Sequence, residues 1–109
     1  MFSSSKKPRV FIFNRGVDGR KSHNGLAAIV RNEMGYDMSK GDIFLFISKN
    51  RRVGKAVIFD GTGLLLFYKK LELGRFMSPD DLKESQQVSV SQLWKIFSGC
   101  RLILGIDLS

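Results

Sequence analysis

Four short apolar segments, separated by polar or glycine-containing stretches, predict most of the strands of this chain. They cover residues 9–13 (RVFIF), 43–47 (IFLFI), 55–59 (KAVIF) and 64–70 (LLLFYKK). Their length and their content of β-branched and aromatic side chains are typical of buried or half-buried strands. The last three follow one another through short connections, which predicts an antiparallel meander, and we expect segment 9–13 to join it on an edge.

Two segments carry apolar side chains at helical spacing. Residues 22–34 predict a long helix, because Ser22 suits the N-cap and Gly35 suits the position that ends a helix. A shorter helix is expected to begin with Ser91 as its N-cap and to end at Gly99. Just before it, the segment Val88-Ser89-Val90 predicts a further edge strand.

The length of 109 residues fits one domain. Helices covering an antiparallel sheet of four to five strands give an α+β fold, which we expect over residues 9–109 after a flexible basic tail at 1–8. No apolar run approaches the length of a membrane span, and the single cysteine, Cys100, cannot form an internal disulfide. We therefore expect a cytoplasmic protein without a membrane segment.

The tetrapeptide Asp60-Gly61-Thr62-Gly63 predicts a tight hairpin turn, because Asp-Gly tolerates the positive φ that such turns need. The residues around this turn carry a family resemblance. From Lys55 to Phe76 the chain is similar to the run K-I-L-Y-W-D-G-D-G-F-x-L-W-Y-K-R-L-E-x-G-R-F. The matching residues are Lys55, Asp60, Gly61, Gly63, Tyr68, Lys69, Leu71, Glu72, Gly74, Arg75 and Phe76.

This run resembles the accessory protein, of the type called TnpB or second open reading frame, of insertion-sequence family sixty-six. Further matches in the same order lie within residues 17–27, 41–52 and 92–107, so the resemblance spans nearly the whole chain. Two of the departures, Phe67 in place of a tryptophan and Lys70 in place of an arginine, keep size or charge. The resemblance implies a role in DNA transposition, with strand cleavage and joining left to the element's separate transposase.

The charge of the chain is distributed unevenly along its length. The formal net charge is +8, and residues 1–55 contain twelve Lys and Arg against four acidic residues, whereas the remainder contains six of each. A locally clustered cationic surface attracts polyanions through Coulomb attraction and counterion release. We therefore expect DNA to be a partner, alongside the transposase that the resemblance implies and a second copy of the chain.

Three cationic groups are the candidate DNA contacts, one before the long helix, one at the predicted hairpin loop 48–54 and one at the exit of the last strand. If they share one face, they form a surface that follows the phosphate backbone; for each group alone, a solvated loop without a partner is the alternative. We expect Arg20, Lys21, Arg51, Arg52, Lys69 and Arg75 to be mostly exposed on such a face. The full set of candidates is Arg15, Arg20, Lys21, Lys49, Arg51, Arg52, Lys55, Lys69, Lys70 and Arg75.

Catalytic chemistry is less well supported, and we expect no enzyme activity, no cofactor and no metal. His23 is the only histidine, and no Cys/His set fits a zinc site. Asp18, Asp60 and Glu72 could converge in a small metal-dependent nuclease, although the turn accounts for Asp60 and an ion pair with a neighbouring cation accounts for Glu72. A protein-interaction module or homodimer without DNA contact is the other alternative, with partner strands added at apolar edges such as 9–13, 88–90 and 102–104.

Overall fold

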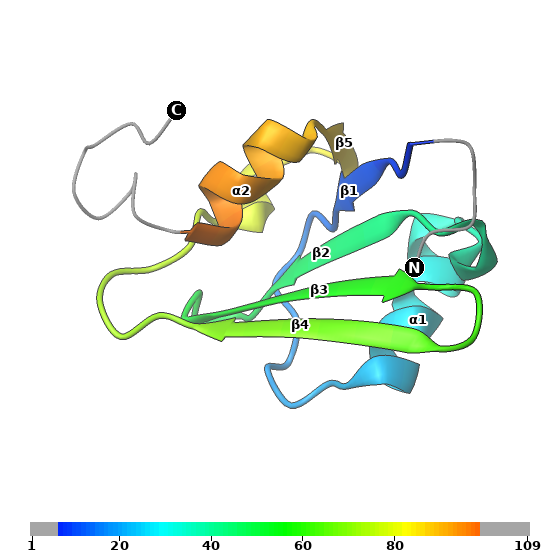
Figure 1. The fold of residues 1–109 in the computed structure, drawn as a ribbon. Helices are drawn as coiled ribbons and strands as arrows, with labels where there is room; N and C mark the ends of the chain where they lie inside the picture. The colour runs from blue at the N-terminus through cyan, green and yellow to red at the C-terminus, as the bar shows by residue number, and fades with distance from the viewer. Residues whose placement is uncertain (1–6, 99–109) are drawn as a thin grey trace.

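The computed structural model describes residues 7–98 of the chain, and its elements form five strands and two helices with short helical turns between them (Figure 1). The predicted stop at Gly99, Cys100 and the segment 102–104 lie outside the described residues. The strands are β1 (Val10–Ile12), β2 (Ile43–Ile47), β3 (Val53–Phe59), β4 (Leu64–Lys70) and β5 (Gln86–Val88). The helical elements are α1 (His23–Ile29), a π-helical continuation (Val30–Met34), two 3-10 turns (Met38–Lys40 and Pro79–Asp81) and α2 (Val90–Ser98).

The five strands form one sheet in the order β4-β3-β2-β1-β5, which confirms an α+β fold. The meander β2-β3-β4 is antiparallel as expected, but β1 pairs with β2 in parallel and with β5 antiparallel, so the sheet is mixed. The expectation that segment 9–13 lies on an edge is therefore wrong, and β4 and β5 form the edges. The connection from β1 to β2 includes α1, and a helical crossover is what allows neighbouring strands to run parallel.

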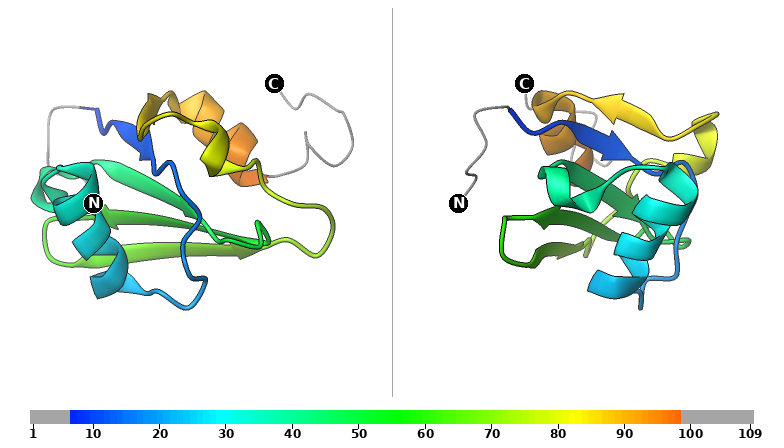
Figure 2. Two further views of the ribbon diagram at one scale, coloured as in Figure 1. Left: turned by 180° about the vertical axis from the view of Figure 1, so that it is seen from behind. Right: turned by 90° about the vertical axis from the view of Figure 1, so that its right-hand side faces the viewer.

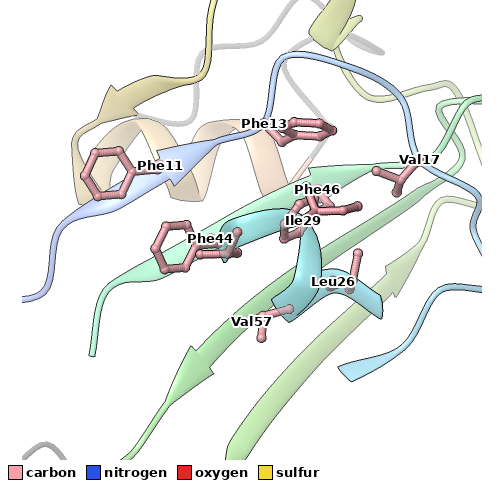
Figure 3. Close-up of a cluster of buried hydrophobic side chains, with 9 residues drawn as sticks. Phe11, Phe13, Val17, Leu26, Ile29, Phe44, Phe46 and Val57 are labelled. Carbon is pink, nitrogen blue, oxygen red and sulfur yellow. The ribbon is translucent and has the colours of Figure 1, made fainter. Parts of the chain in front are cut away.

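The two faces of the sheet are covered by different helices (Figure 2). On one face, Leu26 and Ile29 of α1 pack against phenylalanines of β1 and β2 and against Val57 of β3 (Figure 3). On the other face, Leu93, Ile96 and Phe97 of α2 pack against a second cluster that includes Phe76. Because successive strand residues point to opposite faces, the two clusters use alternate positions of the same strands, which explains why β1 and β2 are apolar throughout.

Both predicted helices form, with one change of cap. The first runs from His23 to Met34 when its π-helical end is included, and Gly35 follows it at φ 78°, a conformation that favours glycine. In the second, the side chain of Ser89 accepts a hydrogen bond from the Gln92 amide at 3.0 Å, and the Gln92 side chain accepts one from the Ser89 amide at 2.8 Å. This reciprocal capping box makes Ser89 the N-cap in place of Ser91.

The predicted turn at Asp60–Gly63 joins β3 to β4. One carboxylate oxygen of Asp60 accepts hydrogen bonds from the amides of Thr62 and Gly63 at 2.9 and 3.0 Å, and Gly61 has φ 103°. These hydrogen bonds hold the pKa of the Asp60 carboxyl below its usual range, and the one from the Thr62 amide has the largest effect. Asp60 therefore has a structural role that needs neither a metal nor a substrate.

A buried lysine joins the first loop to the sheet. Lys55 is 5% exposed, and its Nζ donates hydrogen bonds to the carbonyl oxygens of Gly19 and Lys21 at 2.6 and 2.5 Å. The same ammonium lies 5.5 Å from the ring centroid of Tyr68 on the neighbouring strand β4. Two carbonyl dipoles and an aromatic face thus replace part of the water that the charge loses. The expected DNA contact at Lys55 is therefore corrected, because its charged group is occupied inside the fold.

Two glycine substitutions test the conformation of the turn. We expect Gly61→Ala to lower the free energy of unfolding by about 1–3 kcal/mol, because a side chain at φ 103° strains the backbone. Gly63→Ala should change stability by much less, since Gly63 does not have a positive φ and its added Cβ meets no atom within 4 Å. Chemical denaturation of both variants measures the difference, and equal effects would contradict the described turn.

The buried lysine generates a second prediction. We expect Lys55→Met to lower the free energy of unfolding by about 1–3 kcal/mol, because two carbonyl acceptors lose their shared donor while most of the side-chain volume remains. Lys70→Met is the matched control, because Lys70 is exposed on the same side of the sheet. Urea titration with both variants measures the effect. Loss of DNA binding in Lys55→Met without loss of stability would show that the ammonium faces a ligand instead.

Candidate nucleic-acid interface

Three loops meet at one end of the sheet, where β2 ends, β3 begins and β4 ends. Loop 14–21 is joined to loop 48–52 by a hydrogen bond from the Lys49 amide to the Val17 carbonyl, at 2.9 Å. Segment 71–76 is joined to the same loop by bonds from the Leu71 and Phe76 amides to the carbonyls of residues 52 and 51, each at 2.8 Å. Because these loops contain or border most of the candidate cations, we call this region the cationic end.

Loop 48–52 is held by its own side chains as well as by its neighbours. Asn50 accepts hydrogen bonds from the hydroxyl of Ser48 at 2.7 Å and from the amide of Arg52 at 3.0 Å. The Ser48 hydroxyl in turn accepts from the Val53 amide at 3.0 Å. A Cβ added at Gly16 would lie 2.9 Å from the Cα of Lys49, so the close approach of the two loops requires glycine there. The cations of this loop are therefore carried on a fixed backbone.

The candidate cations at this end divide into free and occupied groups. Arg51 donates from Nε to the Phe76 carbonyl at 2.9 Å, and Lys69 donates from Nζ to the Ser98 carbonyl at 2.9 Å. These two and Arg52 are half-buried, so the expectation that all three are mostly exposed is wrong. Within residues 7–98, no ion pair or side-chain hydrogen bond engages the charged groups of Lys21, Lys49, Arg52, Lys70 and Arg75.

Two further candidates are paired with acids. Arg15 forms an ion pair with Glu33, and its guanidinium lies 5.3 Å from the ring centroid of Phe13. Arg20 forms an ion pair with Asp18 at 2.8 Å and also donates from Nε and from its backbone amide to the same carboxylate. These hydrogen bonds from Arg20 hold the pKa of Asp18 well below its usual range. Arg20 is thus exposed as expected, but its charge is largely offset by Asp18.

A shallow open depression of about 250 Å³ lies between the first two loops. Its lining includes Asp18 and Gly19 from one loop and Ser48, Lys49 and Asn50 from the other. The lining of the depression thus combines one unpaired cation, Lys49, with the arginine-paired carboxylate of Asp18 and with polar residues of loop 48–52.

Acidic residues gather at the opposite end of the sheet. Asp60 follows β3, and Asp37 and Asp42 precede β2, so all three lie where the strands have their other termini. Asp42 is 5% exposed and accepts hydrogen bonds from the Nη2 and backbone amide of Arg9 at 2.8 and 3.0 Å. Most of the free candidate cations thus lie at one end of the strands, and the carboxylates with structural roles lie at the other, together with Arg9 and the exposed Lys40.

The three carboxylates considered for a nuclease do not form one site. Asp18 lies at the cationic end and Asp60 at the other end of β3, whose seven residues span about 20 Å at a strand rise of about 3.3 Å. Within residues 7–98 no three Asp, Glu, His or Cys side chains are grouped so that they could hold a metal ion. Glu72 is exposed, and the ion pair expected for it is absent from the salt bridges of the described residues.

The remaining features noted in the sequence have local explanations. His23 opens α1 on the exposed surface, with its Nδ1 3.0 Å from the Ser22 hydroxyl. In the part of the chain that the structure describes, none of the helices has the length and apolar content needed to cross a membrane. Lys55 and Arg51 are the residues whose roles sequence reasoning missed. The signal for Lys55 is its position in β3. It lies two residues from Val53 and two from Val57, so its side chain shares their buried face.

The amino-acid sequence matches a known family over most of its length. The family described as "IS66 Orf2 like protein" matches residues 8–103. "Uncharacterized protein y4jC" of Sinorhizobium fredii is 35% identical over 79 residues, 72% of this chain and 68% of that protein. "Uncharacterized protein y4hO" of the same organism is 30% identical over 99 residues, 91% of this chain and 86% of that protein. No solved structure matches. The chain belongs to the IS66 Orf2-like family and is a transposition-associated accessory protein.

Proposed function

We propose that this accessory protein binds DNA through its cationic end, without catalysing strand cleavage, and works beside the transposase of the same element. The observation that supports the proposal is a set of five cations at that end that have no ion-pair partner within residues 7–98. Four of them lie in three loops that are hydrogen-bonded to one another, and Lys70 ends β4. Contacts from Lys and Arg to phosphates position a protein on DNA and carry no sequence information. Binding is therefore expected to be largely independent of DNA sequence.

The distribution of charge predicts which end of the domain faces DNA. The carboxylates of Asp37, Asp42 and Asp60 lie at the end remote from most of the free cations, so a polyanion is attracted more strongly to the cationic end than to the other. The depression between loops 14–21 and 48–52 is lined by Lys49 and by the carboxylate of Asp18, so Lys49 is the group there that would contact a phosphate. DNA would therefore lie across loops 14–21, 48–52 and 71–76, with the acidic end pointing away.

Family membership supports the proposed role beside a transposase, and within residues 7–98 no three Asp, Glu, His or Cys side chains are grouped as a metal site. Cations hold a phosphate but do not activate water, whereas nucleolytic metal sites need carboxylates at the phosphate. The protein would thus supply DNA contacts while the transposase supplies the chemistry. An interaction module without DNA contact is the alternative, and it predicts no salt-dependent DNA binding.

The first test neutralises cations one at a time. We expect Lys49→Gln and Arg75→Gln each to weaken binding to duplexes of unrelated sequence and to reduce the log–log salt slope by about 1 per phosphate contact. Lys40→Gln is the matched control, because it removes the same charge from an exposed site at the acidic end. Fluorescence anisotropy at several salt concentrations measures the slopes. Arg51 is unsuitable for this test because Phe76 already holds its guanidinium.

The control also decides between the alternatives. If Lys40→Gln reduces the slope as much as Lys49→Gln does, net charge alone drives binding and the cationic end is not the contact surface. If none of the three variants changes a slope that is already near zero, the interaction module without DNA contact is favoured.

The second test concerns chemistry. We expect purified protein to leave supercoiled and linear DNA intact in the presence of magnesium or manganese, because Asp18, Asp60 and Glu72 do not share a site. Gel electrophoresis of plasmid incubated with metal and protein measures this. Metal-dependent cutting that Asp60→Asn abolishes would overturn the non-catalytic role, whereas cutting that survives the substitution would point to a contaminant.

A further inference from the structure

The long outer strand β4 has a free edge. Its seven residues, LLLFYKK, pair only with β3 in the part of the chain that the structure describes. The opposite edge, β5, has only three residues. A long exposed edge presents unpaired amides and carbonyls, and natural proteins usually shorten, charge or cover such an edge. Here the only charges on the strand are Lys69 and Lys70 at its end.

The ladder with β3 determines which backbone groups of β4 are free. The Asp60 amide donates to the Gly63 carbonyl at 3.0 Å, and the Leu71 amide donates to the residue 52 carbonyl at 2.8 Å. The pairs 60/63 and 52/71, one beyond each end of the β3–β4 ladder, are therefore hydrogen-bonded pairs. Hydrogen-bonded and non-hydrogen-bonded pairs alternate in antiparallel ladders. Residues 65, 67 and 69 therefore direct their backbone groups to β3, and residues 64, 66, 68 and 70 direct theirs outward.

The side chains along this edge are apolar and open to solvent at its centre. Phe67 is 54% exposed and Tyr68 is 56% exposed, and they project on opposite faces of the sheet. A partner strand on the outer edge would cover both rings at once while pairing the outward backbone groups. We propose that this partner is β4 of a second copy of the chain, paired antiparallel about a two-fold axis at Phe67.

The sequence of β4 is self-complementary in this register. With Phe67 opposite its own copy, the outward-directed residues 66 and 68 form hydrogen-bonded pairs with each other, as do 64 and 70. Lys70 lies opposite Leu64, and Lys69 lies opposite Leu65. No lysine faces a lysine, and all seven residues are paired.

Other symmetric registers either pair fewer residues or place lysines opposite each other. Moving the axis by one residue, to Leu66 or Tyr68, leaves two residues of each strand unpaired. Moving it to Lys69 sets like charges directly opposite each other, which is destabilising. An antiparallel pair also places the two cationic ends at opposite ends of the shared strand pair, which limits repulsion between chains of net charge +8. These properties favour a second copy over an unrelated extended peptide.

The expected dimer is weak, because one strand pair with two aromatic rings buries less than the roughly 800 Å² per partner of a stable interface. Sedimentation velocity of the full chain from about 1 to 200 µM should therefore show a concentration-dependent shift from the 12.3 kDa monomer to twice that mass. A chain that remains monomeric over this range would overturn the proposal.

Cross-linking tests the register. In a Cys100→Ser background, Phe67→Cys should form an intermolecular disulfide under mild oxidation, because residues opposite each other in a non-hydrogen-bonded pair come within disulfide reach. Leu65→Cys is the matched control, since its two copies would lie four residues, or about 13 Å, apart along the strands. Equal cross-linking by both variants, or none by Phe67→Cys, would overturn the register.

Charge exchange tests the same contact without oxidation. Phe67→Lys and Phe67→Glu should each abolish self-association, because each sets like charges opposite each other, and mixing the two variants should restore a heterodimer. Trp94→Lys, at a 70% exposed aromatic residue on α2, should leave the dimer intact. Dimers that persist in either Phe67 variant alone would contradict the proposal. Because no step depends on DNA, the result is independent of the proposed DNA binding.

Discussion

The burial of the Lys55 ammonium against two backbone carbonyls is the constraint on which the cationic end depends. The lysine, near the start of β3, donates to the carbonyls of Gly19 and Lys21 and so holds loop 14–21 against the strands. The main-chain bond between Val17 and Lys49 then joins this loop to the hairpin loop. One buried charge, whose ammonium already donates to two backbone carbonyls, thereby helps to fix the backbone that carries exposed charges.

The two ends of the sheet differ in charge. Free cations lie at the end where β2 and β4 finish, and the carboxylates at the other end are used by a turn and by the Arg9 ion pair. The free edge of β4 runs between these two ends. DNA contact and self-association would therefore use adjoining surfaces, and an antiparallel dimer would present two separated cationic ends to one duplex or to two.

The sequence predicted the elements better than their arrangement. Runs such as IFLFI and the Asp60–Gly63 turn carry local signals, so their strands and hairpin could be predicted. The place of β1 between β2 and β5 depends on the helical crossover, a tertiary choice with no local signature. The spacing from Ser89 to Gln92 predicts the capping box at Ser89. The positions of Val53 and Val57, each two residues from Lys55, predict that Lys55 lies on a buried face. The half-burial of Arg51 could not be predicted, because its acceptor, the Phe76 carbonyl, is 25 residues away.

The most direct test of the central claim is to map the DNA-contacting surface by NMR, with a short duplex titrated into isotope-labelled full-length protein. Contact through the cationic end predicts that amide shifts concentrate in loops 14–21, 48–52 and 71–76 and leave residues 37–42 and the 60–63 turn unchanged. Shifts centred on the acidic end or on α2, or no shifts at low salt, would contradict the account.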